Sequence, residues 1–259
     1  MRSTFTKSTL PSWMKGRGFK VIFQLFKRIT KLNQQEAFTL SDSQPRARTV
    51  NLFRDPNEVK RSAVHNCWHP DGGKRLATAY ASIGFQSLHP DASFESYIWD
   101  VENPNKPELT LKPPAMAVCV EYNPKDPNQL LAGLHSGQVC IWDTRLGGVP
   151  TRFSPPDRSH RDPVHQALWI QSKTGTDFFS TSTDGIVKWW DTRKINEPVE
   201  ELILDITKKE NAHLALGAVS LEFEPTMPTK FMVGTERGNI ISGNRKAKTN
   251  ADKIAAVFR

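Results

Sequence analysis

Cysteine is scarce in this chain of 259 residues. The three cysteines, Cys67, Cys119 and Cys140, lie far apart, and no two of them have a CxxC spacing. Disulfide frameworks and zinc sites need more numerous or more closely spaced cysteines, so neither is expected. A reducing compartment fits this composition best.

The motifs of nucleotide binding and of serine hydrolases are absent. The sequence contains no GxxxxGK[ST], no GxGxxG and no GxSxG. These motifs place glycines where the backbone must approach a phosphate closely or present an exposed nucleophile, so neither class of site is supported. We therefore expect no cofactor, no metal ion and no enzymatic activity.

Acidic residues are almost missing from the first 38 positions. This stretch has eight basic side chains and one acidic one, Glu36, which gives it +7 of the formal net charge of +8. The remaining 221 residues have 27 basic and 26 acidic side chains, a balance of +1. Since the body of the protein is nearly neutral, direct nucleic-acid binding is not expected.

Long apolar runs are lacking too. The most apolar stretch of the basic leader, GFKVIFQLFKRITKL at 18–32, is interrupted by Lys20 and Lys27, well short of the ~20 apolar residues that a membrane span needs. Three alternatives remain for the leader, residues 1–44: an organelle transit peptide, a short amphipathic helix on a membrane surface, or an atypical, disordered N-terminus. We favour the last and expect no membrane partner.

What the sequence does contain is a repeat. Three strand-like segments, SYIWD, GQVCIWD and GIVKWWD, end in Trp-Asp, and their tryptophans are 43 and 48 residues apart. The three pairs are Trp99 with Asp100, Trp142 with Asp143, and Trp190 with Asp191. A fourth copy keeps the strand order without the Trp-Asp, and glycines 137, 185 and 238 mark the same tight turn in copies two to four. Four copies of one strand order predict a repeat architecture.

The repeat resembles the WD40 family, whose four-stranded blades pack radially into a β-propeller. The resemblance implies an all-β fold, with a repeat region at 45–259. Its blades are expected at about 62–112, 116–153, 160–204 and 217–259. We expect the aromatic strand residues Trp68, Tyr122, Trp169 and Phe223 to fill the core, and residues 82–95 to form a surface loop.

The third copy matches the hydrogen-bonded tetrad of that family. The matching residues are His160, Ser180, Asp184 and Trp190. In the family the Asp accepts from the His ring, the His bonds to the Ser hydroxyl, and the Ser accepts from the indole, so that buried polar groups satisfy one another. The alternative, a catalytic Ser-His-Asp triad, would need an exposed nucleophile and oxyanion donors, and no motif indicates them.

Longer stretches narrow the resemblance. RTVNLFRDPNEVKRSAVHNCWHPDG (48–72), YNPKDPNQLLAGLHSGQVCIWDTR (122–145), SHRDPVHQALWIQSKTGTDFFSTSTDGIVKWWDTRK (159–194) and LEFEPTMPTKFMVGTERGNIISGNRKAK (221–248) resemble the intermediate chains of the axonemal outer dynein arm, specifically the second intermediate chain. The resemblance covers about residues 45–259.

The family resemblance implies a noncatalytic scaffold. Its expected partners are a dynein heavy chain, a companion intermediate chain, dynein light chains and, through the complex, axonemal microtubules. The expected location is the cytoplasm and the cytoskeleton of the cilium or flagellum. The rival hypothesis is a generic cytoplasmic WD-repeat adaptor in complex assembly, which the repeat pattern alone fits equally well.

The copies stop at four, which is the lower limit for propellers. We therefore expect a partial chain and an incomplete ring, with apolar faces at its ends. The strand candidate TVNLF at 49–53 could supply the strand that closes a ring, but the sequence has only four blades for it to close around.

Overall fold

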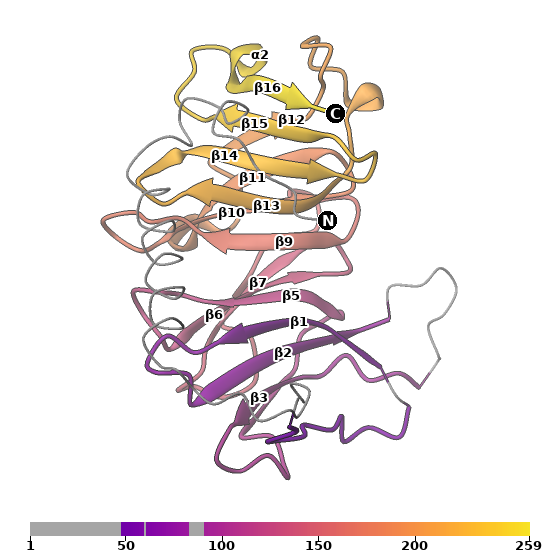
Figure 1. The fold of residues 1–259 in the computed structure, drawn as a ribbon, viewed down its shortest axis with the longest axis vertical. Helices are drawn as coiled ribbons and strands as arrows, with labels where there is room; N and C mark the ends of the chain where they lie inside the picture. The colour runs from indigo at the N-terminus through magenta and orange to yellow at the C-terminus, as the bar shows by residue number, and fades with distance from the viewer. Residues whose placement is uncertain (1–47, 60, 83–90) are drawn as a thin grey trace, which may run out of the picture. The chain divides into compact units, whose positions relative to one another are not determined.

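The computed structural model describes residues 48–59, 61–82 and 91–259. The predicted leader and residues 83–90 of the long loop lie outside these ranges. Residues 50–259 form one compact unit. Its strands form four antiparallel sheets of four strands each (Figure 1). The prediction of an all-β fold made of four four-stranded blades is confirmed.

The four sheets, here called blades one to four, follow the chain. Blade one contains β1 (Ser62–Trp68), β2 (Arg75–Ala81), β3 (Ser96–Asp100) and β4 (Leu109–Leu111). Blade two contains β5 (Ala117–Tyr122), β6 (Gln129–Leu134), β7 (Val139–Asp143) and β8 (Arg152–Phe153). Blade three contains β9 (Val164–Trp169), β10 (Asp177–Ser182), β11 (Ile186–Asp191) and β12 (Glu200–Ile203). Blade four contains β13 (Ala218–Glu224), β14 (Met227–Thr235), β15 (Ile240–Asn244) and β16 (Ile254–Phe258), with the short helix α2 (Asn250–Lys253) before β16.

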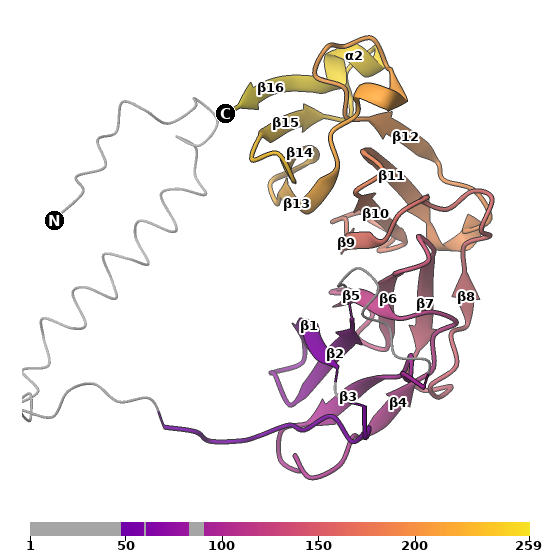
Figure 2. The ribbon, with the colours of Figure 1, turned by 90° about the vertical axis from the view of Figure 1, so that its right-hand side faces the viewer.

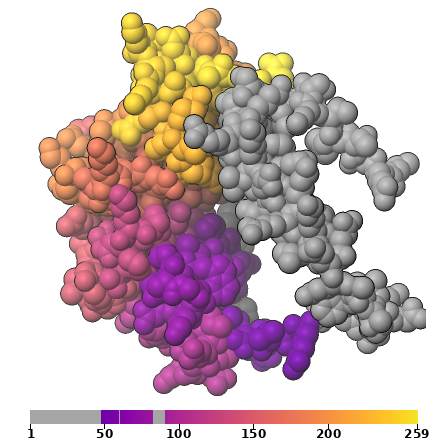
Figure 3. Space-filling model, turned by 60° about the vertical axis from the view of Figure 1, so that its left-hand side comes forward, coloured from indigo at the N-terminus to yellow at the C-terminus, as the bar shows by residue number. Residues whose placement is uncertain are grey.

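Each blade is a meander in which strands pair with their neighbours in sequence. The first strands of the blades, β1, β5, β9 and β13, contact one another in that order and lie on the inner side of the row of sheets (Figure 2). The colours run in bands from indigo to yellow in the space-filling view, so blades adjacent in sequence are also neighbours in space (Figure 3). The four described sheets do not close a ring. No helix of the described residues is long and apolar enough to cross a membrane.

The tight turns of blades two to four are confirmed by their backbone geometry. Gly137, Gly185 and Gly238 have φ angles of +85°, +76° and +78°, in the left-handed region that glycine enters without steric cost. At Gly185 a Cβ atom would also lie 2.5 Å from the Cβ of Ala215. A larger residue at that turn would therefore meet the loop that leads into blade four.

The apolar core lies between the blades. Trp142 packs in the interface of blades one and two, where Cys140 is also buried. Trp190 packs in the interface of blades two and three, where Cys119 is buried. Each of these tryptophans thus faces the preceding blade, and burying a side chain of this size is among the largest favourable contributions that a residue makes.

Blade four lacks this tryptophan for a steric reason. Gly243 pairs with Phe231, as Trp190 pairs with Phe178 in blade three. A Cβ atom on Gly243 would lie 2.2 Å from the Phe231 ring. The Phe231 ring packs instead against Phe179 and Trp189 of blade three. In the fourth copy the aromatic ring of this interface therefore comes from β14 rather than from β15.

Two expectations from the sequence are wrong. Residues 49–53 are not a strand, because β16 already occupies the outer position of blade four. Phe53 instead packs on Trp99 of blade one.

Trp68 is not in the core, since 56% of its surface is exposed. It lies opposite Leu76 and thus on the Trp99 side of blade one, which no other described blade covers. Tyr122 and Trp169 are buried as expected, and Phe223 is partly buried.

Candidate functional site

The four tetrad residues of blade three lie in one chain of hydrogen bonds. His160 Nδ1 is 3.0 Å from Asp184 Oδ2, and His160 Nε2 is 2.8 Å from Ser180 Oγ. The Trp190 indole donates to the same Ser180 oxygen over 2.9 Å. His160 precedes β9, Ser180 is on β10, Asp184 is in the turn after it and Trp190 is on β11, so the contacts join the segment before β9 to β10, β11 and the turn between them.

The direction of these hydrogen bonds follows from the two ends of the chain, where the Asp184 carboxylate accepts and the Trp190 indole donates. Asp184 accepts backbone N–H groups from Ile186 and Arg161, so it is ionised and must also accept from Nδ1. Nε2 is then the acceptor for the Ser180 hydroxyl. Burial opposes ionisation of Asp184, but the hydrogen bond from His160 and the two backbone N–H groups hold its pKa below the usual value.

This geometry does not suit nucleophilic catalysis. Ser180 is fully buried, and its oxygen already accepts from Trp190. A nucleophile must reach the substrate and have oxyanion donors beside it. We interpret the tetrad as a hydrogen-bond network that stabilises blade three.

The other Trp-Asp pairs make different contacts. The Trp142 indole donates to the carbonyl of Gly148 over 3.0 Å, because Ala132 stands where the tetrad has Ser180. Asp143 and Asp191 each cap the following turn and pair with the arginine two positions later, at 2.7 Å and 2.6 Å. These arginine hydrogen bonds lower the pKa of both carboxyl groups. Asp100 accepts the Glu102 backbone N–H.

Sequence reasoning missed a strap on blade one. Residues 50–59, called here the strap, lie along this blade (Figure 2). From Asn51 to Val59 every second side chain is partly buried and those between are exposed. Asn51 donates to the carbonyl of Val101, and Asn57 donates to the Tyr97 hydroxyl. Nothing in the sequence identified these contacts.

Arg61 anchors the strap. Its guanidinium pairs with Asp55 at 3.1 Å, and both side chains are almost fully buried. It also lies 5.2 Å from the centre of the Tyr80 ring and donates to the carbonyls of Ser93 and Glu95. Burial opposes ionisation of Asp55, but hydrogen bonds from Arg61 and Asn57 lower its pKa on balance.

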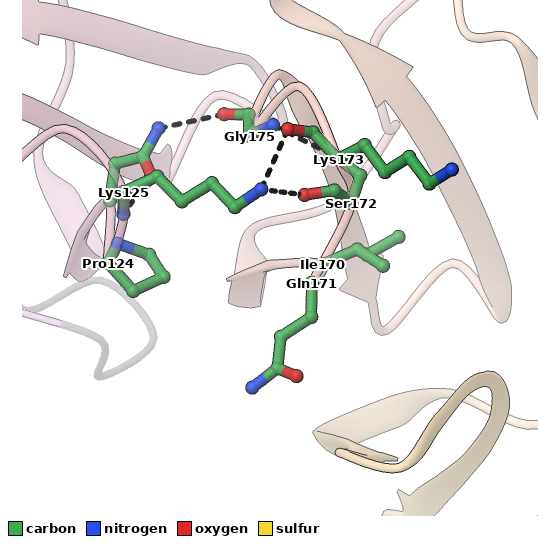
Figure 4. Close-up of a pocket in the computed structure, with 8 residues that line it drawn as sticks. Pro124, Lys125, Ile170, Gln171, Ser172, Lys173 and Gly175 are labelled. Carbon is green, nitrogen blue, oxygen red and sulfur yellow. Dashed lines mark hydrogen bonds between the residues drawn. The ribbon is translucent and has the colours of Figure 1, made fainter.

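A pocket of about 420 Å³ opens between blades two and three. The Lys125 ammonium donates to the carbonyls of Ser172 and Lys173, and the Asn123 amide donates to Gly175 over 2.9 Å (Figure 4). These bonds join the first loops of two blades. Lys125 therefore links blade two to blade three through the two hydrogen bonds that its ammonium group donates.

Among the described residues, Glu121 on the inner strand β5 is the carboxyl group with a large pKa shift toward neutrality. Burial, and then the nearby carboxylate of Glu222, raise its pKa to about 8. Its Oε2 atom is buried and has no hydrogen-bond partner in the described part of the chain. Since burial and a second carboxylate both oppose ionisation, the protonated form of Glu121 is favoured.

We expect stability to fall with rising pH because of Glu121. The Glu121 carboxyl group holds its proton more tightly in the folded chain than in the unfolded chain, where the pKa of this group is near 4.5. The stabilisation is therefore complete below about pH 4.5 and is lost as the pH rises to about 8. Urea unfolding at pH values across this window measures it. Glu121→Gln should flatten the dependence, and an unchanged slope in that variant would contradict the assignment.

The fold and the tetrad together define a WD40-repeat protein of the β-propeller type. No family model matches the chain. Its curated relatives are nevertheless clear. The chain is 57% identical over 226 residues to the human protein "Dynein axonemal intermediate chain 2", a match that covers 87% of the chain. It is 58% identical over 215 residues to the sea urchin (Heliocidaris crassispina) protein "Dynein intermediate chain 3, ciliary", covering 83% of the chain.

A more distant relative belongs to a green alga. The chain is 46% identical over 216 residues, 83% of its length, to the Chlamydomonas reinhardtii protein "Dynein, 70 kDa intermediate chain, flagellar outer arm". The chain spans 37%, 36% and 38% of the lengths of these three relatives. The resemblance inferred from the motifs is confirmed: this chain belongs with the intermediate chains of axonemal outer-arm dynein.

Proposed function

We propose that this chain works as a noncatalytic scaffold subunit of the axonemal outer dynein arm. It docks on a dynein heavy chain and on a companion intermediate chain, associates with dynein light chains, and reaches axonemal microtubules through the complex. Its place is the cytoskeleton of the cilium or flagellum, where the arm supports motility. The observation that carries the proposal is the 57% identity to a human axonemal intermediate chain over 87% of the chain.

The arrangement of polar groups supports a structural rather than a catalytic role. The Ser, His and Asp side chains of blade three are used in hydrogen bonds that tie one blade together. Among the described residues, no group of three or more His, Cys, Asp or Glu side chains could hold a metal ion. A row of blades presents rims and loops to partners, as repeat proteins do.

Affinity capture tests this proposal. The tagged chain of 259 residues, expressed in ciliated cells, should recover a dynein heavy chain and a companion intermediate chain from axonemal extracts. A tagged WD-repeat protein from another complex is the matched control, since it shares the fold without the family match. Recovery of cytoplasmic assembly proteins without dynein subunits would favour the rival adaptor hypothesis. Recovery of the same proteins by both baits would contradict the proposal.

A further inference from the structure

The pocket between blades two and three carries a surplus of positive charge. Its charged lining residues are Lys125 and Lys173, and both side chains are exposed. Among the described residues, neither ammonium group pairs with a carboxylate. Three other pockets in the described part of the chain are each lined by at least one carboxylate. The pocket between blades two and three is therefore the one of these that favours an anionic ligand.

The Lys125 ammonium is held at the edge of this pocket by the protein itself. Its stem crosses from blade two to the first loop of blade three, where a Cβ atom on Gly175 would lie 2.9 Å from Lys125 Cδ. The two carbonyls of that loop accept two of its hydrogen bonds (Figure 4). An ammonium group has three N–H donors, so one is left for a ligand. The carbonyls carry no net charge, and the positive charge of Lys125 stays uncompensated.

The two ammonium groups do not converge on one point. The Lys173 side chain extends away from Lys125 (Figure 4). A phosphate group concentrates its charge and three acceptor oxygens at one place, so it would need donors gathered around that place. Two separate carboxylates of one peptide match the lysines better. Pro124 and Ile170 give the pocket apolar walls, which suit an aliphatic side chain of the same peptide.

We propose that this pocket binds an acidic segment of a partner protein. An aliphatic side chain of the segment packs on Pro124 and Ile170, and the carboxylates that flank it pair with Lys125 and Lys173. Lys125 is already held by its carbonyl partners, so ordering it costs little side-chain entropy. Exposed ion pairs contribute little singly, and burial of the aliphatic side chain adds to the affinity. The site is formed by the chain itself, whichever complex the chain joins.

Binding of three short peptides tests the proposal. The probes are Ac-Gly-Glu-Leu-Glu-Gly-NH2, a version with both glutamates replaced by glutamine, and a version with the leucine replaced by glycine. Each is titrated into the full chain and followed by saturation-transfer NMR. The first peptide should bind, and each replacement should weaken binding at least about fivefold. If either replacement leaves the affinity unchanged, or if the first peptide does not bind, the proposal is wrong.

Inorganic phosphate serves as the competing probe. Added at the concentration of the first peptide, it should leave the peptide signals as they are in sodium chloride of the same ionic strength, which controls for screening. Displacement of the peptide by phosphate alone would show that the site takes a free dianion, and would overturn the choice of an acidic peptide.

Lysine variants locate the binding. Lys173→Met removes an ammonium group that has no hydrogen bond or ion pair among the described residues, so it should weaken binding of the first peptide about threefold and leave the melting temperature unchanged. Lys125→Met should weaken binding about fivefold and lower the melting temperature, because two hydrogen bonds between blades are lost.

The matched control is Lys112→Met. Lys112 is exposed and does not line the pocket, so this variant should bind the first peptide as the unaltered chain does. An equal loss of binding in Lys112→Met and Lys173→Met would indicate a general effect of charge and would sink the assignment. Unchanged binding in both Lys125→Met and Lys173→Met would do the same.

Discussion

Trp190→Ala is expected to lower the free energy of unfolding by about 3 to 5 kcal/mol, as large-to-small changes of buried aromatic residues do. Trp190 is 1% exposed and packs between blades two and three against Phe178, with ring centres 6.2 Å apart. Its removal leaves a cavity there and takes away the indole that bonds Ser180. Urea unfolding monitored by circular dichroism measures the loss.

The matched control for this variant is Trp68→Ala. The same chemical change is made on blade one, where 56% of the side chain is exposed, so the loss should stay within about 1 kcal/mol. Asp184→Ala should cost roughly 1 to 3 kcal/mol, because His160 loses its acceptor. A Trp190→Ala protein as stable as the Trp68→Ala protein would refute the structural role of the tetrad.

Arg61→Ala is expected to cost about 3 to 5 kcal/mol, the usual effect of removing one partner of a buried ion pair. The change deprives the buried Asp55 carboxylate of its guanidinium and takes a cation from the Tyr80 and Tyr97 rings. The strap should then separate from blade one. Limited trypsin digestion measures this separately from stability, through faster cleavage after Arg54, which lies within the strap.

Arg237→Ala serves as the comparison for Arg61→Ala. Arg237 is an exposed residue of the turn before β15, so its removal should change stability by no more than about 0.5 kcal/mol. If cleavage after Arg54 is equally slow in both variants, the strap is held by its other contacts and not by Arg61.

The sequence predicts the blades well because their signals are local and repeated. A Trp-Asp at the end of the third strand and a glycine in the preceding turn recur at fixed offsets, and both act within one hairpin. The tetrad residues could be named for the same reason, although the naming came from a family resemblance. These local patterns can be recognised without knowing which blades pack against each other.

The errors concern contacts between segments that are distant in sequence. The sequence predicts a strand at 49–53, and the structure has the strap there instead, with side chains alternately exposed and partly buried. Its partner is blade one, through Asn51 and Phe53. Period two tells which side chains share a face but not what covers that face. Trp68 was assigned to the core on residue type alone, which fails on a face that no other described blade covers.

Gly243 shows a further limit of this kind. A missing tryptophan in the fourth copy reads as a weakened repeat, yet Phe231 supplies an aromatic ring to the same interface from the neighbouring strand. The compensation is a matter of steric fit across two strands. No pattern along the chain encodes it.

Two of the blade interfaces each contain a buried thiol, which can report on the opening of that interface. Cys140 lies between blades one and two and Cys119 between blades two and three, and burial raises the pKa of Cys119 to about 12. A thiol reagent attacks only the thiolate, so neither residue is alkylated while its interface stays closed. Pulsed alkylation followed by mass spectrometry therefore gives a separate opening rate for each interface, and the native sequence carries both reporters without engineering.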